Sequence, residues 1–232
     1  MSQSERKNMK YSHEVAGLKA DIDLIETDLS GKLYPLNPKD FFWEGQKMGQ
    51  KHYLRKEVVN MLLKAKSFLP KGYTFFIYET FRSHEKQQAM FQSMLLKMQE
   101  KCPNLSLKEL REKTNVYVAD PDGIGSGHQT GAAIDLTICD LNKNCLDMGA
   151  KYLEADDEKT AMASKKIPLM AIKNRYLFKR VMEEAGFLNY PPEWWHFSYG
   201  EHEWAVLSGK HKTIYRAIKN PVVVLNKERQ RG

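Results

Sequence analysis

The alternation of apolar and polar positions divides the first half of the chain into helices and strands. From Tyr53 to Leu69 apolar residues recur at helical spacing, and Pro70-Lys71-Gly72 ends the pattern, which predicts a core helix. Tyr73 to Tyr78 is a short aromatic and β-branched run after a glycine and predicts a strand. A second helix is expected from Ser83, which can cap it, to about Glu100.

The following segment ends in a glycine-rich loop that leads into a strand. Between Cys102 and Gly131 a short helical stretch precedes Asp120-Pro121-Asp122-Gly123, a strong turn signal. Ala132 to Ile138 then alternates, with Ile134, Leu136 and Ile138 on one face of the expected strand. Asp135 therefore points away from the apolar face.

The last third of the chain predicts one more helix and one more strand. Pro168 and Gly186 bracket the helix, and we expect on or near its buried side the residues Ile172, Tyr176, Val181 and Ala185. Trp194 to Tyr199 is expected to be an aromatic strand, with Trp194 and Trp195 packed in the core. Helices and strands interleave without a regular βαβ repeat, which favours an α+β layer structure over a doubly wound sheet.

Length and composition indicate one core. A chain of 232 residues with 42% hydrophobic residues can bury a single good core. Residues 1–20 are polar and aperiodic and predict a flexible N-terminal arm, which leaves residues 21–232 as a single domain.

Charge, cysteines and hydropathy narrow the class of protein. The formal net charge is +7, but basic residues are scattered among acids and concentrate only in Arg6–Lys10 and Lys227–Arg231, so we expect a solvated surface and no nucleic-acid partner. The odd number of cysteines, without paired spacing, favours reduced thiols. No stretch resembles a secretion signal or spans a bilayer, so we expect a cytoplasmic protein, or a periplasmic one if a leader has been removed.

Two short segments carry candidate chemistry. His128 lies on a glycine-flanked loop that feeds directly into the strand of Asp135, and Glu193 precedes His196 by three positions. Two histidines and one carboxylate with water in the fourth position form the usual open site of catalytic zinc. A lone histidine is more often a surface or core residue, but the two segments together favour one zinc ion per chain, held by His128, Asp135 and His196.

The remaining candidates would handle protons and charge. Glu193 can act as general base and acid if Pro191-Pro192 forms a turn, because in a straight strand it would face away from His196. Arg82, just past the first strand, is the candidate for stabilising an oxyanion, although alone it is better explained as a surface salt-bridge residue. We expect the other histidines to be structural or superficial, with His84 and His202 closest in sequence to candidate residues.

At these residues the chain resembles the zinc D-Ala-D-Ala metallopeptidase family, and its dipeptidase branch in particular. The pattern S-x-H-x-x-G-x-A-x-D and the pattern E-x-x-H are both met, and the two tryptophans between Glu193 and His196 are similar to the dipeptidase branch. The segments at residues 78–82 and 147–149 are also similar, so the resemblance covers roughly residues 50–205. It implies a Hedgehog and DD-peptidase type of α+β fold, with a central antiparallel sheet flanked by helices.

The resemblance also implies roles for named residues. It implies zinc bound by His128, Asp135 and His196, Glu193 as base and acid, and Arg82 at the oxyanion. It further implies that Ser126 and, less directly, Glu154 contact the substrate. In the family's dipeptidases an Asp shortly after the Asp-Met-Gly segment holds the substrate's free amine, whereas this chain reads Ala150-Lys151-Tyr152-Leu153-Glu154, with Glu154 as the candidate substitute.

Three functions follow as alternatives. The first is a zinc dipeptidase that hydrolyses D-alanyl-D-alanine or a similar short peptide. The second is a cell-wall D,D-carboxypeptidase or endopeptidase of the same fold, expected to have an open groove in place of a closed pocket. The third is a zinc-binding interaction module without catalysis, which would need neither Glu193 nor Arg82.

Overall fold

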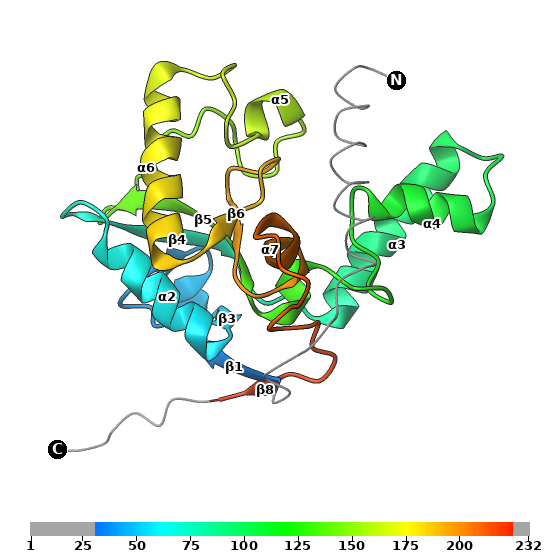
Figure 1. Ribbon diagram of the computed structural model, residues 1–232, viewed down its shortest axis with the longest axis horizontal. Coiled ribbons are helices and arrows are strands. Elements are labelled where there is room, and N and C mark those ends of the chain that lie inside the picture. Colours follow the sequence, from blue (N-terminus) through cyan, green and yellow to red (C-terminus); the bar gives the residue numbers. More distant parts are fainter. Residues whose placement is uncertain (1–30, 225–232) are drawn as a thin grey trace.

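Two β-sheets organise residues 31–224, the part of the chain that this computed structural model describes (Figure 1). The larger sheet has the strand order β2 (Phe42–Trp43), β4 (Tyr73–Glu79), β5 (Ala133–Asp140), β7 (His196–Ser198) and β6 (Leu188–Asn189). The smaller one has the order β3 (Tyr53–Leu54), β1 (Lys32–Pro35) and β8 (Val222–Val223). The expected arm at residues 1–20 lies outside the described residues, and the extent of the domain stays a prediction.

The larger sheet is antiparallel from β4 to β6, and only its edge strand β2 runs parallel to its neighbour. The helices are α2 (Lys56–Ser67), α3 (His84–Lys101), α4 (Leu107–Asn115), α5 (Asp157–Thr160), α6 (Leu169–Ala185) and α7 (His202–Leu207), and the 3-10 turns are η1 (Gln46–Met48) and η2 (Gly127–Thr130). The expected α+β class with a largely antiparallel central sheet is confirmed.

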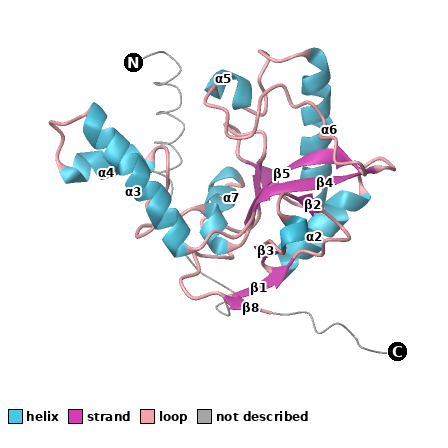
Figure 2. Ribbon diagram, turned by 180° about the vertical axis from the view of Figure 1, so that it is seen from behind, coloured by secondary structure: helices cyan, strands magenta, loops and turns pink. Residues whose placement is uncertain are grey.

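The main core lies between the larger sheet and the helices α2 and α6. Alternate residues of β5, Ile134, Leu136 and Ile138, are fully buried there beside Phe75 of β4 and Phe178 of α6. Figure 2 shows both helices against the sheet. The apolar face of β5 is the one that the alternation predicts, and it leaves Asp135 on the opposite face.

Local signals place the ends of the helices. Ser83 caps α3, since its hydroxyl accepts a hydrogen bond from the amide of Lys86. Pro168 and Gly186 bracket α6, and Gly186 has a positive φ of 107° that a residue with a side chain rarely adopts. Those boundaries agree with the sequence prediction.

The buried face of α6 agrees with the prediction at Val181 and Ala185 and differs from it at Ile172 and Tyr176. Tyr176 is 69% exposed and Ile172 is 36% exposed, whereas Arg175 between them is buried. The Arg175 guanidinium donates to the carbonyl oxygens of Met148 (2.7 Å) and Ala161 (2.6 Å) and so ties the segment beyond β5 to the helix. Counting apolar residues alone had assigned Ile172 and Tyr176 to the wrong side, because a hydrogen-bonded arginine occupies the inward position.

Helices α3 and α4 extend away from the sheet and pack on each other (Figure 1). They share a small cluster of their own, made by Phe91, Leu95, Met98 and Leu110. Between residues 31 and 224 no helix combines the length and the apolar character needed to cross a bilayer. The compartment of the protein stays a prediction.

Candidate metal centre

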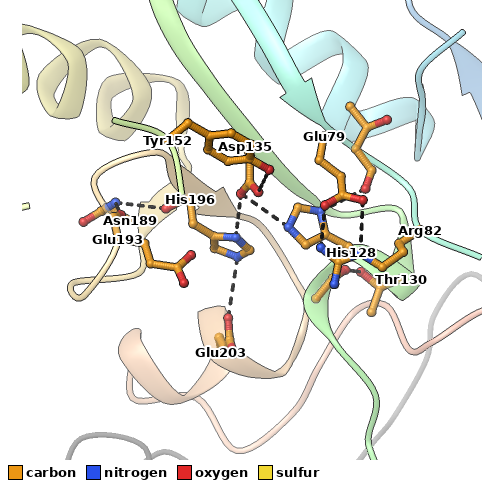
Figure 3. Close-up of polar contacts among 12 residues, drawn as sticks. Glu79, Arg82, His128, Thr130, Asp135, Tyr152, Asn189, Glu193, His196 and Glu203 are labelled. Carbon is orange, nitrogen blue, oxygen red and sulfur yellow. Dashed lines mark hydrogen bonds and ion pairs between the residues drawn. The ribbon is translucent and has the colours of Figure 1, made fainter. Parts of the chain in front are cut away.

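Strand pairing brings three acidic and imidazole side chains into one row across the larger sheet. Asp135 of β5 lies opposite His196 of β7 on one side and opposite Glu79 of β4 on the other. Directly opposite residues of neighbouring strands point to the same face. The face of β5 that the alternation marks as non-apolar therefore carries the polar site (Figure 3).

His128 joins this row from the turn that precedes β5. The turn η2 ends at Gly131, whose φ is +70° and whose amide bonds to the carbonyl of His128. A Cβ on Gly131 would lie 2.5 Å from the Leu33 side chain, so both backbone angle and space require glycine there. This tight turn sends the chain into β5 and places His128 five residues before Ala133, the first residue of that strand.

The three side chains form a compact group that can hold a metal. One ligand atom from each of His128, Asp135 and His196 lies within 4.8 Å of the others, and all three residues are buried. The Asp135 Oδ1 atom is 3.3 Å from Nε2 of His128 and 2.9 Å from Nδ1 of His196. Two atoms bound tetrahedrally to zinc at about 2.0–2.1 Å would be separated by roughly 3.3 Å, so the spacing fits such an ion.

Neighbouring groups fix which nitrogen of each imidazole faces the centre. Nδ1 of His128 is 2.9 Å from the carbonyl oxygen of Thr80, which only accepts, so Nδ1 carries the proton and Nε2 has a lone pair for a metal. Nε2 of His196 lies 3.6 Å from the Glu203 carboxylate, which leaves Nδ1 for the centre. A carbonyl or carboxylate behind each imidazole is the usual support of metal-binding histidines.

Tyr152 holds the Asp135 carboxylate in the same way. Its hydroxyl donates to the Oδ2 atom of Asp135 at 3.0 Å, while Oδ1 faces the two imidazoles. Its ring stacks on Tyr78, with centroids 4.2 Å apart, and meets Trp195 edge-on. The aromatic packing holds the hydroxyl in place.

The charges of the site are strongly coupled. Burial acts to raise the pKa of Asp135, but the two imidazoles hold it well below its usual range. Burial acts to lower the pKa of His196, yet Asp135 and the carboxylates of Glu203 and Glu193 raise it to about 10. A metal cation would displace the proton that these carboxylates otherwise attract to the histidine.

Glu193 lies in a turn, as the two prolines suggested. Its amide donates to the carbonyl of Tyr190, and the chain becomes extended only at His196. Figure 3 shows its carboxylate on the same side as the His196 imidazole. Burial, with Asp135 and Glu203 nearby, raises its pKa to about 7, which suits a group that exchanges protons near neutrality.

Arg82 is held at the edge of the site by an acid and an amide. Its Nε and one terminal nitrogen donate to both oxygens of Glu79, at 3.1 and 2.5 Å, and the other donates to Gln87 at 2.8 Å. Its backbone amide donates to the carbonyl of His128, which ties it to the turn η2. Three of its five N–H groups donate hydrogen bonds among residues 31–224, and the other two donate none there.

The site opens into a cleft of about 780 Å³ that continues along the pair of helices α3 and α4. Its lining includes the three candidate ligands together with Arg82, Ser126, Glu193 and Glu203, and on the helical side Met90, Leu107, Lys108, Arg111 and Tyr117. The Ser126 hydroxyl is buried and has no hydrogen-bond partner in the described part of the chain. Ser126 lines the cleft, and its contact with a substrate stays a prediction.

Glu154 is not brought to the cleft. Its carboxylate accepts a hydrogen bond from the amide of Lys151 at 2.7 Å, which closes a local turn. Leu153, with a positive φ of 57°, lines the cleft in its place and is 67% exposed. Of these two neighbouring residues only Leu153 lines the cleft, and a substrate contact at Glu154 stays a prediction.

Sequence reasoning missed the supporting residues Glu79, Tyr152 and Glu203. Glu79 could have been noticed, because it precedes Arg82 by three positions. No local signal marks Tyr152 or Glu203, whose partners Asp135 and His196 are distant in sequence. His202 and His84 lie apart from the three-residue group: His202 is 3.2 Å from the Glu201 carboxylate, and His84 is 3.8 Å from Asp122.

Comparisons with known proteins point to one family. The family model described as Peptidase_M15, D-ala-D-ala dipeptidase, matches residues 43–215. A D-alanyl-D-alanine dipeptidase of Escherichia coli (strain K12) is 32% identical over 145 residues, which are 62% of this chain and 65% of that protein. One of Enterococcus faecium is 30% identical over 148 residues, 61% of this chain and 70% of that protein. The match thus spans slightly less than two thirds of the Escherichia coli relative.

The similarity of this chain to solved structures is weaker. VanYB in complex with D-Alanine-D-Alanine has a TM-score of 0.41 and 17% identity, with 68% of this chain and 80% of that chain covered. VanXYg, a D,D-dipeptidase in complex with a D-Ala-D-Ala phosphinate analog, has a TM-score of 0.38 and 22% identity, with 68% and 56% covered. Overlaps this low carry no argument about individual residues.

Proposed function

We propose, from the premise that the chain belongs to the D-Ala-D-Ala dipeptidase family of peptidases, that it is a zinc peptidase acting on D-alanyl-D-alanine or a similar short D-amino-acid peptide. The observation that carries the proposal is the convergence of His128, Asp135 and His196 within 4.8 Å, with Glu193 beside them. We propose that these three residues bind one zinc ion per chain. Two imidazoles and a carboxylate leave a coordination position for water or substrate.

Glu193 is proposed to move the proton in the reaction. A bound zinc ion supplies Lewis-acid activation of water and of the scissile carbonyl. The Glu193 carboxylate accepts the proton of the attacking water and returns it to the nitrogen of the leaving amine. A pKa of about 7 allows both steps, because at neutral pH the protonated and the ionised forms of the carboxyl are both populated.

Arg82 and Ser126 are proposed to bind the substrate. The Arg82 guanidinium keeps its charge throughout the cycle, and Glu79 and Gln87 fix its plane. Its two remaining N–H groups suit the negative oxygen that develops as the carbonyl is attacked. Ser126 lines the same cleft, and its hydroxyl, which has no hydrogen-bond partner among residues 31–224, is proposed to offer a neutral hydrogen bond.

The shape of the cleft favours a second candidate, a peptidase for longer peptides such as a D,D-carboxypeptidase or endopeptidase. A free dipeptide of about ten non-hydrogen atoms would fill only part of about 780 Å³, a volume typical of sites for larger ligands. Leu153 stands at the cleft where a carboxylate would be needed to hold a free amine, and Glu154 turns to the backbone instead. Both features suit a chain that continues beyond the scissile bond.

A non-catalytic zinc module is the third candidate. Such a module requires the three ligands, but it does not need the Glu193 carboxyl with a pKa of about 7 beside them or the Arg82 side chain held by Glu79. The retention of Glu193 and Arg82 in the cleft therefore favours an enzyme.

A release assay tests these candidates together. The zinc-loaded protein is incubated with D-Ala-D-Ala, with L-Ala-L-Ala and with a longer peptide ending in D-Ala-D-Ala, and the products are measured by mass spectrometry. Cleavage of the free D,D dipeptide alone supports the dipeptidase, and faster cleavage of the longer peptide supports the second candidate. A protein that binds one zinc ion but releases nothing from any of the three would refute both enzymes, and the variant Glu193→Gln serves as the matched inactive control.

A further inference from the structure

Two cysteines face each other in the hairpin that follows β5. Cys139 belongs to β5, and Cys145 pairs with it across a tight turn. The backbone hydrogen bonds flank the pair: the amide of Asp140 donates to Asn144 (3.0 Å), and that of Leu146 donates to Ile138 (2.9 Å). Cys139 and Cys145 are thus a non-hydrogen-bonded antiparallel pair, the kind whose side chains approach most closely.

The turn is held by its own polar contacts. The Asp140 carboxylate accepts hydrogen bonds from the amide of Asn142 and from the amide and side chain of Asn144, at 2.8 to 2.9 Å. Lys143 takes a positive φ of 69° to close it. The hairpin's own hydrogen bonds therefore hold the two cysteines opposite each other.

The two thiols differ in exposure and in acidity. Cys139 is fully buried and Cys145 is exposed. A hydrogen bond between the thiols raises the pKa of Cys139, which burial raises further, and lowers the pKa of Cys145. Cys145 is the accessible thiol with the greater thiolate fraction, and Cys139 is its protected neighbour.

We propose that Cys139 and Cys145 are a reversible redox pair that closes to an intramolecular disulfide across this hairpin. Opposite residues of this kind ordinarily have Cα atoms about 4.5 Å apart. That value falls within the range of about 4.4 to 6.8 Å found for disulfides, so the bond needs no rearrangement of the backbone. The proposal does not depend on the function proposed for the metal centre.

Hydrogen peroxide is the oxidant to which the exposed thiol is suited. The Cys145 thiolate attacks one peroxide oxygen, the O–O bond breaks, and a sulfenic acid forms with release of water after protonation. The Cys139 thiol then attacks the Cys145 sulfur, the S–O bond breaks, and a second water leaves with the Cys139 proton. Two thiols and one peroxide thus yield one disulfide and two waters.

The bond would link β5 to the segment that follows the hairpin. That segment contains Met148, which accepts a hydrogen bond from Arg175, and Tyr152, which donates to Asp135. The disulfide would restrict the motion of this segment where it leaves the hairpin. It changes no side chain of the proposed metal centre itself.

Peptide mapping of the full chain tests the proposal. Trypsin cuts after Lys113, Lys143 and Lys151, so Cys139 lies in peptide 114–143 and Cys145 in peptide 144–151. The reduced protein is treated with hydrogen peroxide, its free thiols are alkylated, and it is digested without reduction. We expect the two peptides to be recovered covalently linked, with Cys102 alkylated.

Two variants serve as controls. Cys102→Ser removes the third thiol and is expected to give the same linked peptides. Cys145→Ser replaces an exposed side chain, which keeps the fold, and is expected to leave Cys139 alkylated only after denaturation. The proposal fails if the wild-type peptides are recovered unlinked with both thiols still alkylated, if Cys145 is over-oxidised while Cys139 stays free, or if Cys145 is linked to Cys102 or to a second chain.

Discussion

Replacing Tyr152 by phenylalanine removes one hydrogen bond to the candidate zinc ligand Asp135 and keeps the aromatic ring. The lost contact is the 3.0 Å bond from the Tyr152 hydroxyl to Oδ2. The stacking on Tyr78 and the edge contact with Trp195 involve the ring, so they persist in the variant. The change therefore isolates the support of the carboxylate.

The size of the effect follows from two estimates. A hydrogen bond to a charged group contributes about 1.5–3 kcal/mol. Removal of a group that supports a metal ligand lowers metal affinity by about 10-fold to 100-fold, or roughly 1.4–2.7 kcal/mol. Because the same bond exists before the metal binds, part of its energy cancels. We expect the lower end, about a tenfold loss of zinc affinity for Tyr152→Phe.

Competition for zinc against a chromophoric chelator, at one fixed pH, measures this affinity. The matched control is Tyr78→Phe, which removes a hydroxyl from the stacked neighbour of Tyr152. Equal zinc affinities of Tyr152→Phe, Tyr78→Phe and the wild type would show that the hydroxyl does not support the ligand. Tighter zinc binding by Tyr152→Phe would refute the reasoning more sharply. It would mean that the hydrogen bond from the hydroxyl makes the Asp135 carboxylate a poorer ligand for zinc.

Four further outcomes are expected. Glu193→Gln should keep its zinc but lose turnover by about 10²-fold to 10⁴-fold; a wild-type kcat would remove Glu193 from the mechanism. His128→Ala should bind less zinc by elemental analysis, and a full complement of metal would show that this ligand is misplaced. Arg82→Lys cannot keep the two-pronged contact with Glu79, so kcat should fall at unchanged zinc content; unaltered kinetics would make Arg82 merely structural. Burial acts to raise the pKa of Glu79, but Arg82, His128 and Lys86 together outweigh it and lower that pKa from 4.5 to about 2. Glu79 should thus contribute at most about 3 kcal/mol to the free energy of unfolding, fully present above its ordinary pKa and lost as the pH falls toward 2. Urea unfolding at a series of pH values should show that Glu79→Gln loses less stability in acid than the wild type does. Parallel plots of unfolding free energy against pH for the two proteins would contradict this.

The helices were predictable because their signals are local. Ser83 supplies the cap of α3 from its own position, and Pro168 and Gly186 restrict backbone angles at the ends of α6. The inward face of α6 was not predictable in the same way. Arg175 is buried only because the carbonyl oxygens of Met148 and Ala161 lie where its guanidinium can donate to them, and those residues are distant along the chain.

By itself the sequence determined which side chains are chemically able to bind a metal and move a proton: two imidazoles, a carboxylate on the non-apolar face of a strand, and a glutamate after two prolines. Only the tertiary structure decided that they meet. The register that sets Asp135 opposite His196 joins residues 61 positions apart, and it results from packing of the whole sheet on α2 and α6. The contacts of Tyr152 and Glu203, and the openness of the cleft, depend on that packing too, because they join segments that no local pattern connects.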